Sequence, residues 1–427
     1  MHSKAITFDT EPSQTSASYT ADREEVDSVV LLYSGGLDTS VMVHWIQEHY
    51  DAEVITVTLD LGQPGVDLDA IRQKALDTGA EEAVVVDAKQ EFAEEYVAAA
   101  IKANALYQGQ YPLSSAIARY LTMEKAVEVA KHHGADAVAH GCTGKGNDQV
   151  RFDSTVMALD KDLQVIAPVR EWSMTRDKEI AYAEEHGIPV EETDDSPYST
   201  DENLWGKSSE CGPLDDPGQE PPDDVFEFVT VPENAPDEPA YVDIGFEDGI
   251  PVTLDGEQLP LHALIMELNE IAGQHGVGIV DMSEDRVVGL KSREIYECPA
   301  AVTLLQAHED LQKFCSTKHE NSFKQAVEQQ WAELAYSGLW HDPLMDHLNA
   351  FLDSINTGVT GTVTVKLYKG SAQVVGRESA QALYDHNLAT YEAGETFNHD
   401  ASPGFIELWS LQTKLANEVT DSETVDG

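Results

Sequence analysis

The sequence predicts an α/β protein, in which a doubly wound parallel sheet precedes an α+β domain and a C-terminal helical arm. Three observations predict this order. Short apolar runs alternate with helical segments in the first part of the chain, and the alternation breaks near residues 191–197. Hydrophobic residues make up 41% of the 427 residues, which is enough to bury sizeable cores and excludes a wholly disordered acidic chain.

Apolar runs that are too short for helices predict the strands of the parallel sheet. Residues 27–33 (DSVVLLY) are continuously apolar, as expected of a strand buried on both faces. Four further runs of this kind lie at 53–60, 82–87, 136–140 and 164–167. The segments between them are predicted to be helices, at 36–49, 67–78, 90–105, 115–133 and 175–186.

The second half of the chain predicts mixed elements. Residues 211–239 are rich in Pro, Asp and Glu, which suggests a surface excursion around one strand at 225–230. The elements expected after it are strands at 241–246 and 252–254, a helix at 259–274, a long helix within 306–336, a hairpin of 361–367 and 373–376 that turns at Lys369 and Gly370, and helical pieces at 380–391 and 405–417. We therefore expect a flexible extension (1–27), two domains (28–195 and 196–385) and an arm (386–427).

The charge is extreme. The chain has 78 acidic and 26 basic residues, a formal charge of −52, which would repel phosphate backbones and argues against nucleic-acid partners. The acidic residues run through several helices and form no single block, so adaptation to molar salt is favoured over an acidic interaction tail. No apolar run approaches the length of about 18 residues that a membrane span needs, and no secretory signal pattern is present. We expect a soluble cytoplasmic protein with free cysteines and no resident metal.

Two glycine loops follow predicted strands. The first reads Tyr33-Ser-Gly-Gly-Leu-Asp-Thr-Ser40, where a glycine pair and hydroxyl side chains at a helix start would grip a pyrophosphate. The bland alternative is an ordinary strand–helix turn, which the full SGGxDTS string disfavours. No GxxxxGK[ST] motif occurs, so transfer of a γ-phosphoryl group is disfavoured.

The second loop, HGCTGKGNDQVRF at 140–152, would lie along the same carboxyl edge of the sheet, where ligands of such folds bind. Thr143 and Asn147 can hydrogen-bond a carboxylate or ureido group, Arg151 can bind an oxyanion, and Asp148 can hold an ammonium group. A solvated glycine-rich loop is the alternative.

SGGxDTS resembles the pyrophosphate loop of the ATP pyrophosphatases, and five blocks in order resemble the argininosuccinate synthases over nearly all of residues 28–411. Besides the two loops, the blocks are YPLSSAIAR from Tyr111, SPYSTDENLW from Ser196 with its continuation to Ser208, and GVGIV at 276–280 with the segment from Glu284 to Tyr296. Many members of the family carry Gly-Thr-Ser or Gly-Thr-Ala where this chain has Ser114-Ser115-Ala116, so a side-chain hydrogen bond from residue 116 to citrulline is not expected.

The resemblance implies a reaction in which the ureido oxygen of citrulline attacks ATP to give citrullyl-AMP, and aspartate then displaces AMP to form argininosuccinate. ATP with Mg²⁺ and a homotetramer are implied as well. Domain 28–195 would bind the nucleotide, and 196–385 would be the synthetase and oligomerisation domain. The implied ATP-binding residues are Leu32, Tyr33, Ser34, Gly35, Gly36, Leu37, Asp38, Thr39, Ser40, Leu59 and Gly141; those for aspartate are Thr143, Asn147 and Asp148; those for citrulline are Tyr111, Asn147, Arg151, Ser199, Ser208, Glu284 and Tyr296; Asp38 and Asp148 are the catalytic candidates.

Two rival functions are less well supported. Other adenylating enzymes with this loop need a cysteine pair and a basic RNA surface, or a glutaminase partner, and the sequence shows neither. An ATP sensor would not need the amino-acid segments. Because ATP and aspartate are anions, we also expect the sparse basic residues near the motifs to make the cleft locally positive: Arg119, Lys145, Arg151, Lys207, Arg286, Lys291 and Arg293.

Overall fold

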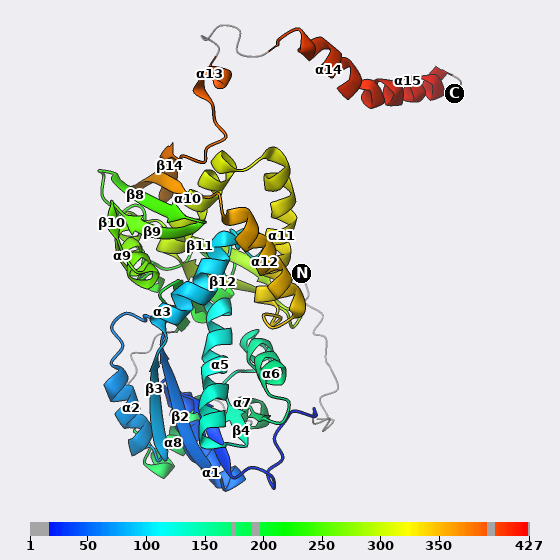
Figure 1. Ribbon diagram of the computed structural model, residues 1–427. Coiled ribbons are helices and arrows are strands. Elements are labelled where there is room, and N and C mark those ends of the chain that lie inside the picture. Colours follow the sequence, from blue (N-terminus) through cyan, green and yellow to red (C-terminus); the bar gives the residue numbers. More distant parts are fainter. Residues whose placement is uncertain (1–16, 173, 175, 190–196, 391–397, 426–427) are drawn as a thin grey trace. The chain divides into compact units, whose positions relative to one another are not determined.

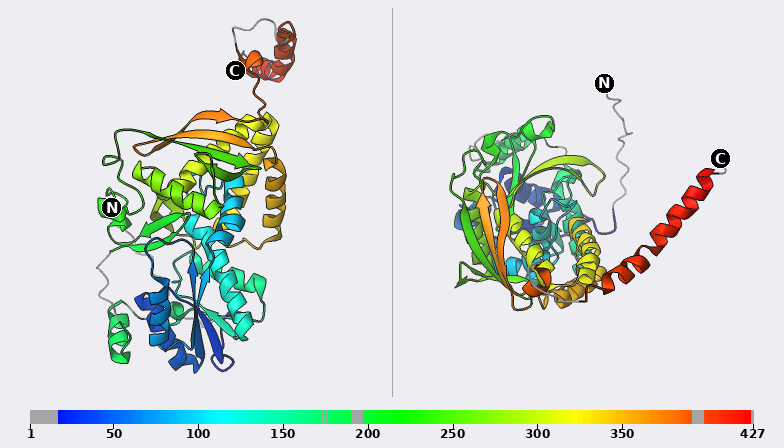
Figure 2. Two further views of the ribbon diagram at one scale, coloured as in Figure 1. Left: turned by 60° about the vertical axis from the view of Figure 1, so that its left-hand side comes forward. Right: turned by 90° about the horizontal axis from the view of Figure 1, so that it is seen from above.

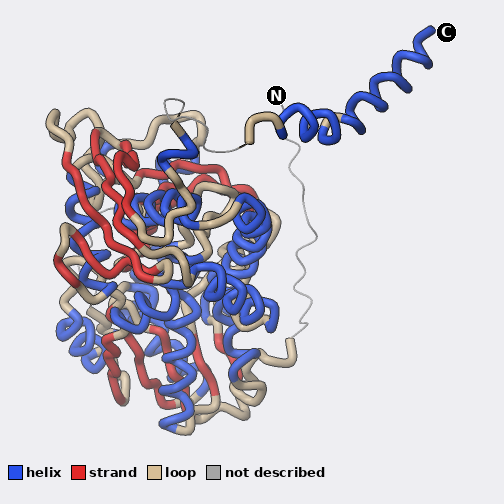
Figure 3. Tube along the Cα trace, turned by 45° about the horizontal axis from the view of Figure 1, so that its top comes forward, coloured by secondary structure: helices blue, strands red, loops and turns tan. Residues whose placement is uncertain are grey.

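The structure is a computed structural model that describes residues 17–172, 174, 176–189, 197–390 and 398–425. The chain divides into two compact units, one reaching to Gln381 and one beginning at Ala382. In the first unit, the parallel sheet and the larger antiparallel sheet lie at opposite ends (Figures 1 and 2). Figure 3 shows helices packed around both groups of strands.

The predicted parallel sheet is confirmed. Its strands are β1 (Ser28–Leu32), β2 (Glu53–Asp60), β3 (Glu82–Asp87), β4 (Ala137–Ala139) and β5 (Gln164–Ile166), all parallel and in the order β3-β2-β1-β4-β5. The chain moves outward from β1 in one direction through β2 and β3, and in the other through β4 and β5. The strand order thus reverses beside β1, and this is the position at which open α/β sheets bind ligands.

Both faces of this sheet are covered, because alternate residues of β1 enter different cores. Val29 and Leu31 belong to a core shared with α1 (Leu37–Tyr50) and α8 (Arg176–His186), whereas Val30 belongs to the core shared with α5 (Ser114–His133). The other helices of this half are α2 (Leu68–Asp77), the consecutive turns α3 (Lys89–Glu91), η1 (Phe92–Val97) and α4 (Ala98–Lys102), then α6 (Asp148–Leu159) and α7 (Pro168–Glu171). A sheet covered in this way explains the continuous apolar pattern of β1.

The second half contains an antiparallel sheet in the order β10-β9-β8-β13-β14. Its hairpin turns at Lys369 and Gly370 as predicted, and both residues have positive φ (44° and 84°). The strands are β8 (Ala240–Glu247), β9 (Ile250–Leu254), β10 (Glu257–Gln258), β13 (Gly361–Tyr368) and β14 (Ser371–Glu378), and the helices are α9 (Leu261–Gln274), α10 (Pro299–Cys315), α11 (Lys318–Tyr336) and α12 (Pro343–Asn356).

The sequence analysis missed a four-stranded sheet. Its order is β11-β12-β7-β6, built from β11 (Ile279–Asp285), β12 (Lys291–Glu297), β7 (Gly206–Glu210) and β6 (Ser199–Asn203). Strands with sequences such as STDEN and GKSSE carry no apolar alternation. β6 pairs with β7 and β11 pairs with β12 as local hairpins, and the pairing of β7 with β12, which is distant in sequence, joins the two hairpins; single-sequence patterns do not register that pairing.

One predicted strand is wrong. The strand at 225–230 is absent: a one-turn helix η3 (Asp223–Val225) is followed by a turn whose three successive amides, at 227, 228 and 229, donate to the carboxylate of Glu297. A second one-turn helix, η2 (Gly212–Asp215), also lies in this excursion. The long helix predicted within 306–336 is α11; the same range also holds the end of α10, because Thr317 and Glu320 form a capping box that starts α11 after α10 has ended.

The second unit contains α13 (His386–Ala389), α14 (Ala401–Trp409) and α15 (Leu411–Val425). The helical piece predicted at 405–417 falls within α14 and α15, whereas the piece predicted at 380–391 is reduced to α13, and its last residue lies outside the described residues. In the described part of the chain, no helix combines the length and the apolar character that crossing a membrane requires.

Candidate active site

One cavity of about 790 Å³ lies at the carboxyl edge of the parallel sheet, between the two glycine loops and the small four-stranded sheet. It brings together most of the residues that the sequence analysis nominated. Those lining it are Leu32, Tyr33, Ser34, Gly36, Leu37, Asp38, Thr39, Leu59, Tyr111, Gly141, Asn147, Asp148, Arg151, Ser199, Ser208, Glu284 and Tyr296.

Three nominated residues lie elsewhere. Gly35 lines a smaller neighbouring pocket, and Thr143 is outside the cavity lining. Ser40 is fully buried, and its hydroxyl donates to the carbonyl oxygen of Gly36 at 2.8 Å. Ser40 therefore supports the turn from within and does not face the cavity.

The first loop presents an open helix N-terminus. Gly36 is the N-cap residue of α1, a 14-residue helix, and has no side chain that could cap it. The first backbone amides of the helix therefore lie at the cavity with no side-chain hydrogen bond from the cap residue. Ser34 and Thr39 join their hydroxyls at 3.3 Å across the loop. Gly35 has φ +80°, and a Cβ there would also come within 3.0 Å of Ile71, so a glycine is required. This geometry suits an anion.

Asp38 lies at the start of α1 and faces the start of α8. Its carboxylate is 3.8 Å from the guanidinium of Arg176. Burial, together with a hydrogen bond and the charge of Asp38, raises the pKa of Glu179 to about 7. Near neutral pH, therefore, Glu179 is partly protonated beside Asp38, which limits the repulsion between the two carboxyl groups.

A chain of buried hydrogen bonds centred on His140 lies behind the second loop. The Nδ1 atom of His140 accepts the amide of Cys142 at 3.2 Å, so its Nε2 carries the proton and donates to Asp153 at 2.7 Å. The other oxygen of Asp153 accepts from Arg170 at 2.8 Å. Burial raises the pKa of the Cys142 thiol, so this thiol is a poor nucleophile. This chain of hydrogen bonds fixes the backbone of the second loop at Cys142.

Asp148 joins two arginines. Its carboxylate lies 2.9 Å from Nε of Arg119 and 2.8 Å from Arg151, and Arg119 also pairs with Asp201 at 2.8 Å. Burial acts to raise the pKa of Asp148, but the charges of Arg119 and Arg151 outweigh it and hold that pKa below its ordinary value. The carboxylate is therefore ionised and fixes both guanidinium groups.

Two pairs of stacked tyrosines lie around a buried carboxylate. Glu284, which is 2% exposed, accepts hydrogen bonds of 2.7 Å from the hydroxyls of Tyr296 and Tyr336. Tyr296 stacks on Tyr111 with a ring separation of 3.9 Å, and Tyr336 stacks on Tyr107 at 3.5 Å. The arrangement forms a rigid wall with an anionic centre.

Tyr111 also organises the start of α5. Leu113 before this helix has φ 63° and offers no side-chain cap, and the hydroxyl of Tyr111 accepts the amides of Ser115 and Ala116 at 3.0 and 3.2 Å. Ala116 thus contributes a hydrogen bond through its backbone amide, although its side chain has no hydrogen-bonding group. Ser115 in turn donates to the Ser208 hydroxyl at 3.1 Å, which ties α5 to β7.

Asn147 and Arg151 are largely committed to protein partners. The amide group of Asn147 donates to the Tyr336 hydroxyl and accepts the amide of Val287, both at 2.8 Å. Arg151 is 4% exposed and donates to the carbonyl of Tyr336 at 3.0 Å. Its Nη2 atom is buried and has no hydrogen-bond partner, so one donor of this guanidinium remains for a ligand.

Comparison with known proteins agrees with this geometry. Residues 28–189 match the family model described as "Arginosuccinate synthase N-terminal HUP domain", and residues 198–416 match "Arginosuccinate synthase C-terminal domain". The chain belongs to the argininosuccinate synthase family. Relatives named argininosuccinate synthase include those of Oceanobacillus iheyensis (53% identity over 92% of this chain and 94% of the relative), Rubrobacter xylanophilus (57%; 90% and 94%) and Pyrococcus furiosus (56%; 91% and 94%).

In this family member, the prediction of a positive cleft is wrong. The cavity lining has four arginines (Arg119, Arg151, Arg176 and Arg286) against seven acidic side chains (Asp38, Asp148, Asp201, Glu202, Glu210, Glu284 and Glu294). The other nominated bases, Lys145, Lys207, Lys291 and Arg293, do not line it. Lys207 is buried against Glu227, while Lys291 and Arg293 pair with Asp285 and Asp281. Five of the seven acids come from β6, β7, β11 and β12, the sheet that the sequence analysis missed.

The same sheet brings in site residues that sequence reasoning did not nominate for ligand binding. Arg286 pairs with Glu210 and lies 2.7 Å from Glu294. Burial, followed by the charge of Glu210, raises the pKa of Glu294 to about 8. Arg286 and Glu294 fall inside the block from Glu284 to Tyr296, so the family motif could have identified them as site residues. Tyr336, at the end of α11, lies in no such motif, so no sequence pattern indicated its place in the site.

Proposed function

We propose that this chain is an ATP-dependent carbon–nitrogen ligase that joins citrulline and aspartate into argininosuccinate, with release of AMP and pyrophosphate, in arginine biosynthesis. The observation that carries the proposal is that one cavity joins an open pyrophosphate-type loop to the network of Asp148, Arg151 and Glu284. Relatives at 52–57% identity over about nine-tenths of the chain bear the name of that activity. The reaction runs through a citrullyl-AMP intermediate.

ATP places its β- and γ-phosphates on the amides at the start of α1 and on the hydroxyls of Ser34 and Thr39, with Leu59 beside the adenine. Asp38, whose carboxylate is half exposed beside the loop, would be a suitable oxygen ligand for Mg²⁺ bound with ATP, which would offset the phosphate charge. The chain's own contribution is to orient the α-phosphate toward the amino-acid side of the cavity and to exclude water.

Citrulline occupies the side lined by Tyr111, Ser199, Ser208, Glu284 and Tyr296. The buried carboxylate of Glu284 favours a cationic amino group, and the unpartnered Nη2 of Arg151 favours an anionic or carbonyl oxygen. Aspartate binds by the second loop near Thr143, Asn147 and Asp148. Because Asp148 already pairs with two arginines, we propose that it acts by positioning them in addition to meeting the amine.

The test is product analysis with purified protein. AMP and pyrophosphate should form from ATP only when citrulline and aspartate are both present. ADP as product, or turnover that ignores citrulline, would contradict the proposal, and binding of ATP with no AMP formed would favour a sensor. An Asp38→Ala variant serves as the control for contaminating ATPases.

We further propose a cytoplasmic homotetramer, with the domain boundaries given above, in which the arm packs on a neighbouring subunit. In α14, Phe405, Leu408 and Trp409 are 61%, 76% and 74% exposed, and such a face gains free energy when it is buried. Truncation after Asp400 should therefore lower the subunit count measured by sedimentation. An unchanged count would rule out the arm as the cause.

The acidity supports a proposal of salt adaptation. Acidic side chains such as Asp67, which caps α2, and Asp69 and Asp77 within it are exposed. Their mutual repulsion is screened more strongly as the Debye length falls to about 3 Å at 1 M salt. We expect the unfolding temperature to rise between about 0.1 and 3 M KCl, over which screening becomes complete. Choline chloride at equal ionic strength separates screening from potassium binding, and a maximum in dilute buffer would contradict the proposal.

A further inference from the structure

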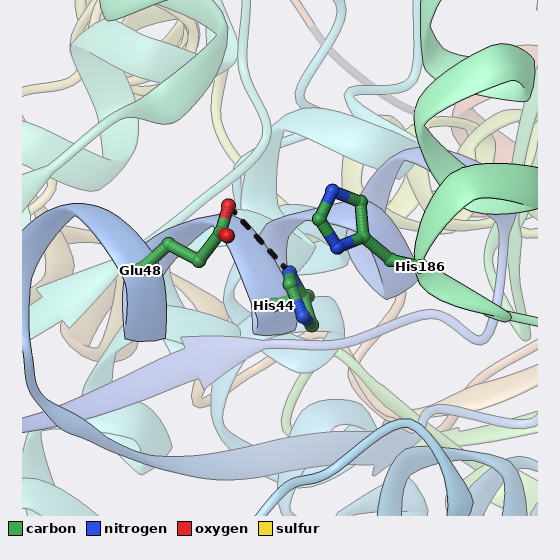
Figure 4. A group of neighbouring side chains, drawn as sticks. All are labelled: His44, Glu48 and His186. Carbon is green, nitrogen blue, oxygen red and sulfur yellow. Dashed lines mark ion pairs between the residues drawn. The ribbon is translucent and has the colours of Figure 1, made fainter.

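Away from the cavity, two histidines and a glutamate converge between α1 and α8. His44 and Glu48 are one turn apart on α1, so they share a helix face, and His186 comes from the last turn of α8 (Figure 4). A ligating atom from each of the three residues lies within 4.8 Å of those of the other two. In the described part of the chain this is the only group of three or more His, Cys, Asp or Glu side chains that meets this spacing.

The three side chains are held together by neighbouring groups. The ring centroids of His44 and His186 are 4.2 Å apart, and the ring of Tyr182 lies 4.2 Å from that of His186. The Tyr182 hydroxyl donates to Glu48 at 2.7 Å and lies 2.9 Å from Nδ1 of His44. A single phenol thus orients both residues of α1, as outer-shell groups do around metal ligands.

The chemistry of the three side chains suits a cation. Two imidazole rings and one carboxylate supply nitrogen and oxygen donors of the kind that divalent transition metals bind. His44 and His186 are half-buried and Glu48 is exposed, so the group is open to solvent on one side.

We propose that His44, Glu48 and His186 bind one zinc-class divalent ion, with water at the remaining position. The N₂O donor set suits Zn²⁺, Co²⁺ or Ni²⁺, whereas Mg²⁺ and Ca²⁺ prefer oxygen ligands. Zn–N bonds of about 2.0–2.1 Å place tetrahedral ligand atoms about 3.3 Å apart, so partly exposed side chains need only close the present spacing by modest rotations.

The site would fasten α8 to α1. The opposite end of α8 carries Arg176 and Glu179 beside Asp38 at the pyrophosphate-type loop. An ion that joins the other ends of the two helices restrains α8 against the helix on which that loop opens. Binding to the folded state alone also stabilises it, by an amount that grows with the logarithm of the ion concentration.

The test is titration of chelator-treated full-length protein, without nucleotide, with Co²⁺ and Zn²⁺. We expect one Co²⁺ per chain with visible d–d absorption and without the thiolate charge-transfer band that a cysteine site would give, displaced by Zn²⁺ and not by excess Mg²⁺. His44→Ala and His186→Ala should each abolish this signal, and Tyr182→Phe should weaken affinity about 10–100-fold, as loss of an outer-shell partner does.

His133→Ala is the matched control, because His133 lies 3.9 Å from Glu82 and, among the described residues, belongs to no group of three side chains with metal-ligand spacing. It should bind as the wild type does. No stoichiometric Co²⁺ signal in wild type, equal binding in His186→Ala, or loss of binding in His133→Ala would each overturn the proposal. Zn²⁺ should also raise the unfolding temperature of the wild type and not that of His186→Ala; equal shifts would overturn it as well.

Discussion

Replacing Asp148 by asparagine should lower kcat/KM by about 100-fold or more, the loss expected when reacting groups are displaced by about 1 Å. The carboxylate holds Arg119 and Arg151 at 2.9 and 2.8 Å. Without its charge, the two guanidinium groups repel each other and Arg151 shifts against Tyr336, to which it donates. Both substrate sides of the cavity lose their alignment.

Rapid-quench measurement of the adenylate separates the two half-reactions. We expect release of AMP by aspartate to fall more than formation of citrullyl-AMP, because Asp148 lies on the loop assigned to aspartate. Both should fall, because Arg151 reaches the citrulline side. Asp162→Asn, which alters an exposed pair with Lys161, should leave both steps unchanged. An Asp148→Asn enzyme with normal turnover would refute this role.

The largest effect on stability is expected for Glu297→Ala. This side chain is 1% exposed, and one of its oxygens accepts three successive backbone amides, those of Glu227, Phe228 and Val229, at 2.7–2.9 Å. The alanine variant leaves these amides unpaired and leaves Lys207 with Glu227 alone. Breaking such a buried pair costs about 3–5 kcal/mol.

Urea titration followed by tryptophan fluorescence measures this loss of unfolding free energy. Glu297→Gln should lose less, since its amide oxygen can still accept from the turn. Glu309→Ala, which removes an exposed i,i+4 pair with Lys313, should change stability by less than about 1 kcal/mol. A Glu297→Ala protein as stable as Glu309→Ala would show that the turn at 227–229 is held by other contacts.

The sequence alone determined the parallel sheet and the loops at its edge. Strands such as Ser28–Leu32 and Glu53–Asp60 are buried on both faces, so their sequences are continuous apolar runs from which the strands can be predicted. The two glycine loops directly follow β1 and β4. Because the carboxyl ends of parallel strands lie at the same edge of a sheet, both loops lie at that edge. The family motifs then gathered Tyr111, Ser208 and Glu284, which lie far apart in sequence and line one cavity.

Tertiary structure alone decided the small sheet, the charge of the cleft and the histidine pair. Ser199–Asn203 and Gly206–Glu210 have no apolar pattern; they pair with each other as a hairpin, and the pairing of β7 with β12, which is distant in sequence, builds that hairpin into the sheet. The acidic residues of these strands then line the cavity, so its net charge is negative and not positive as expected. His44 and His186 meet only because α1 and α8 pack together. In each case the decisive interaction joins residues distant in sequence, and no local propensity or spacing encodes it.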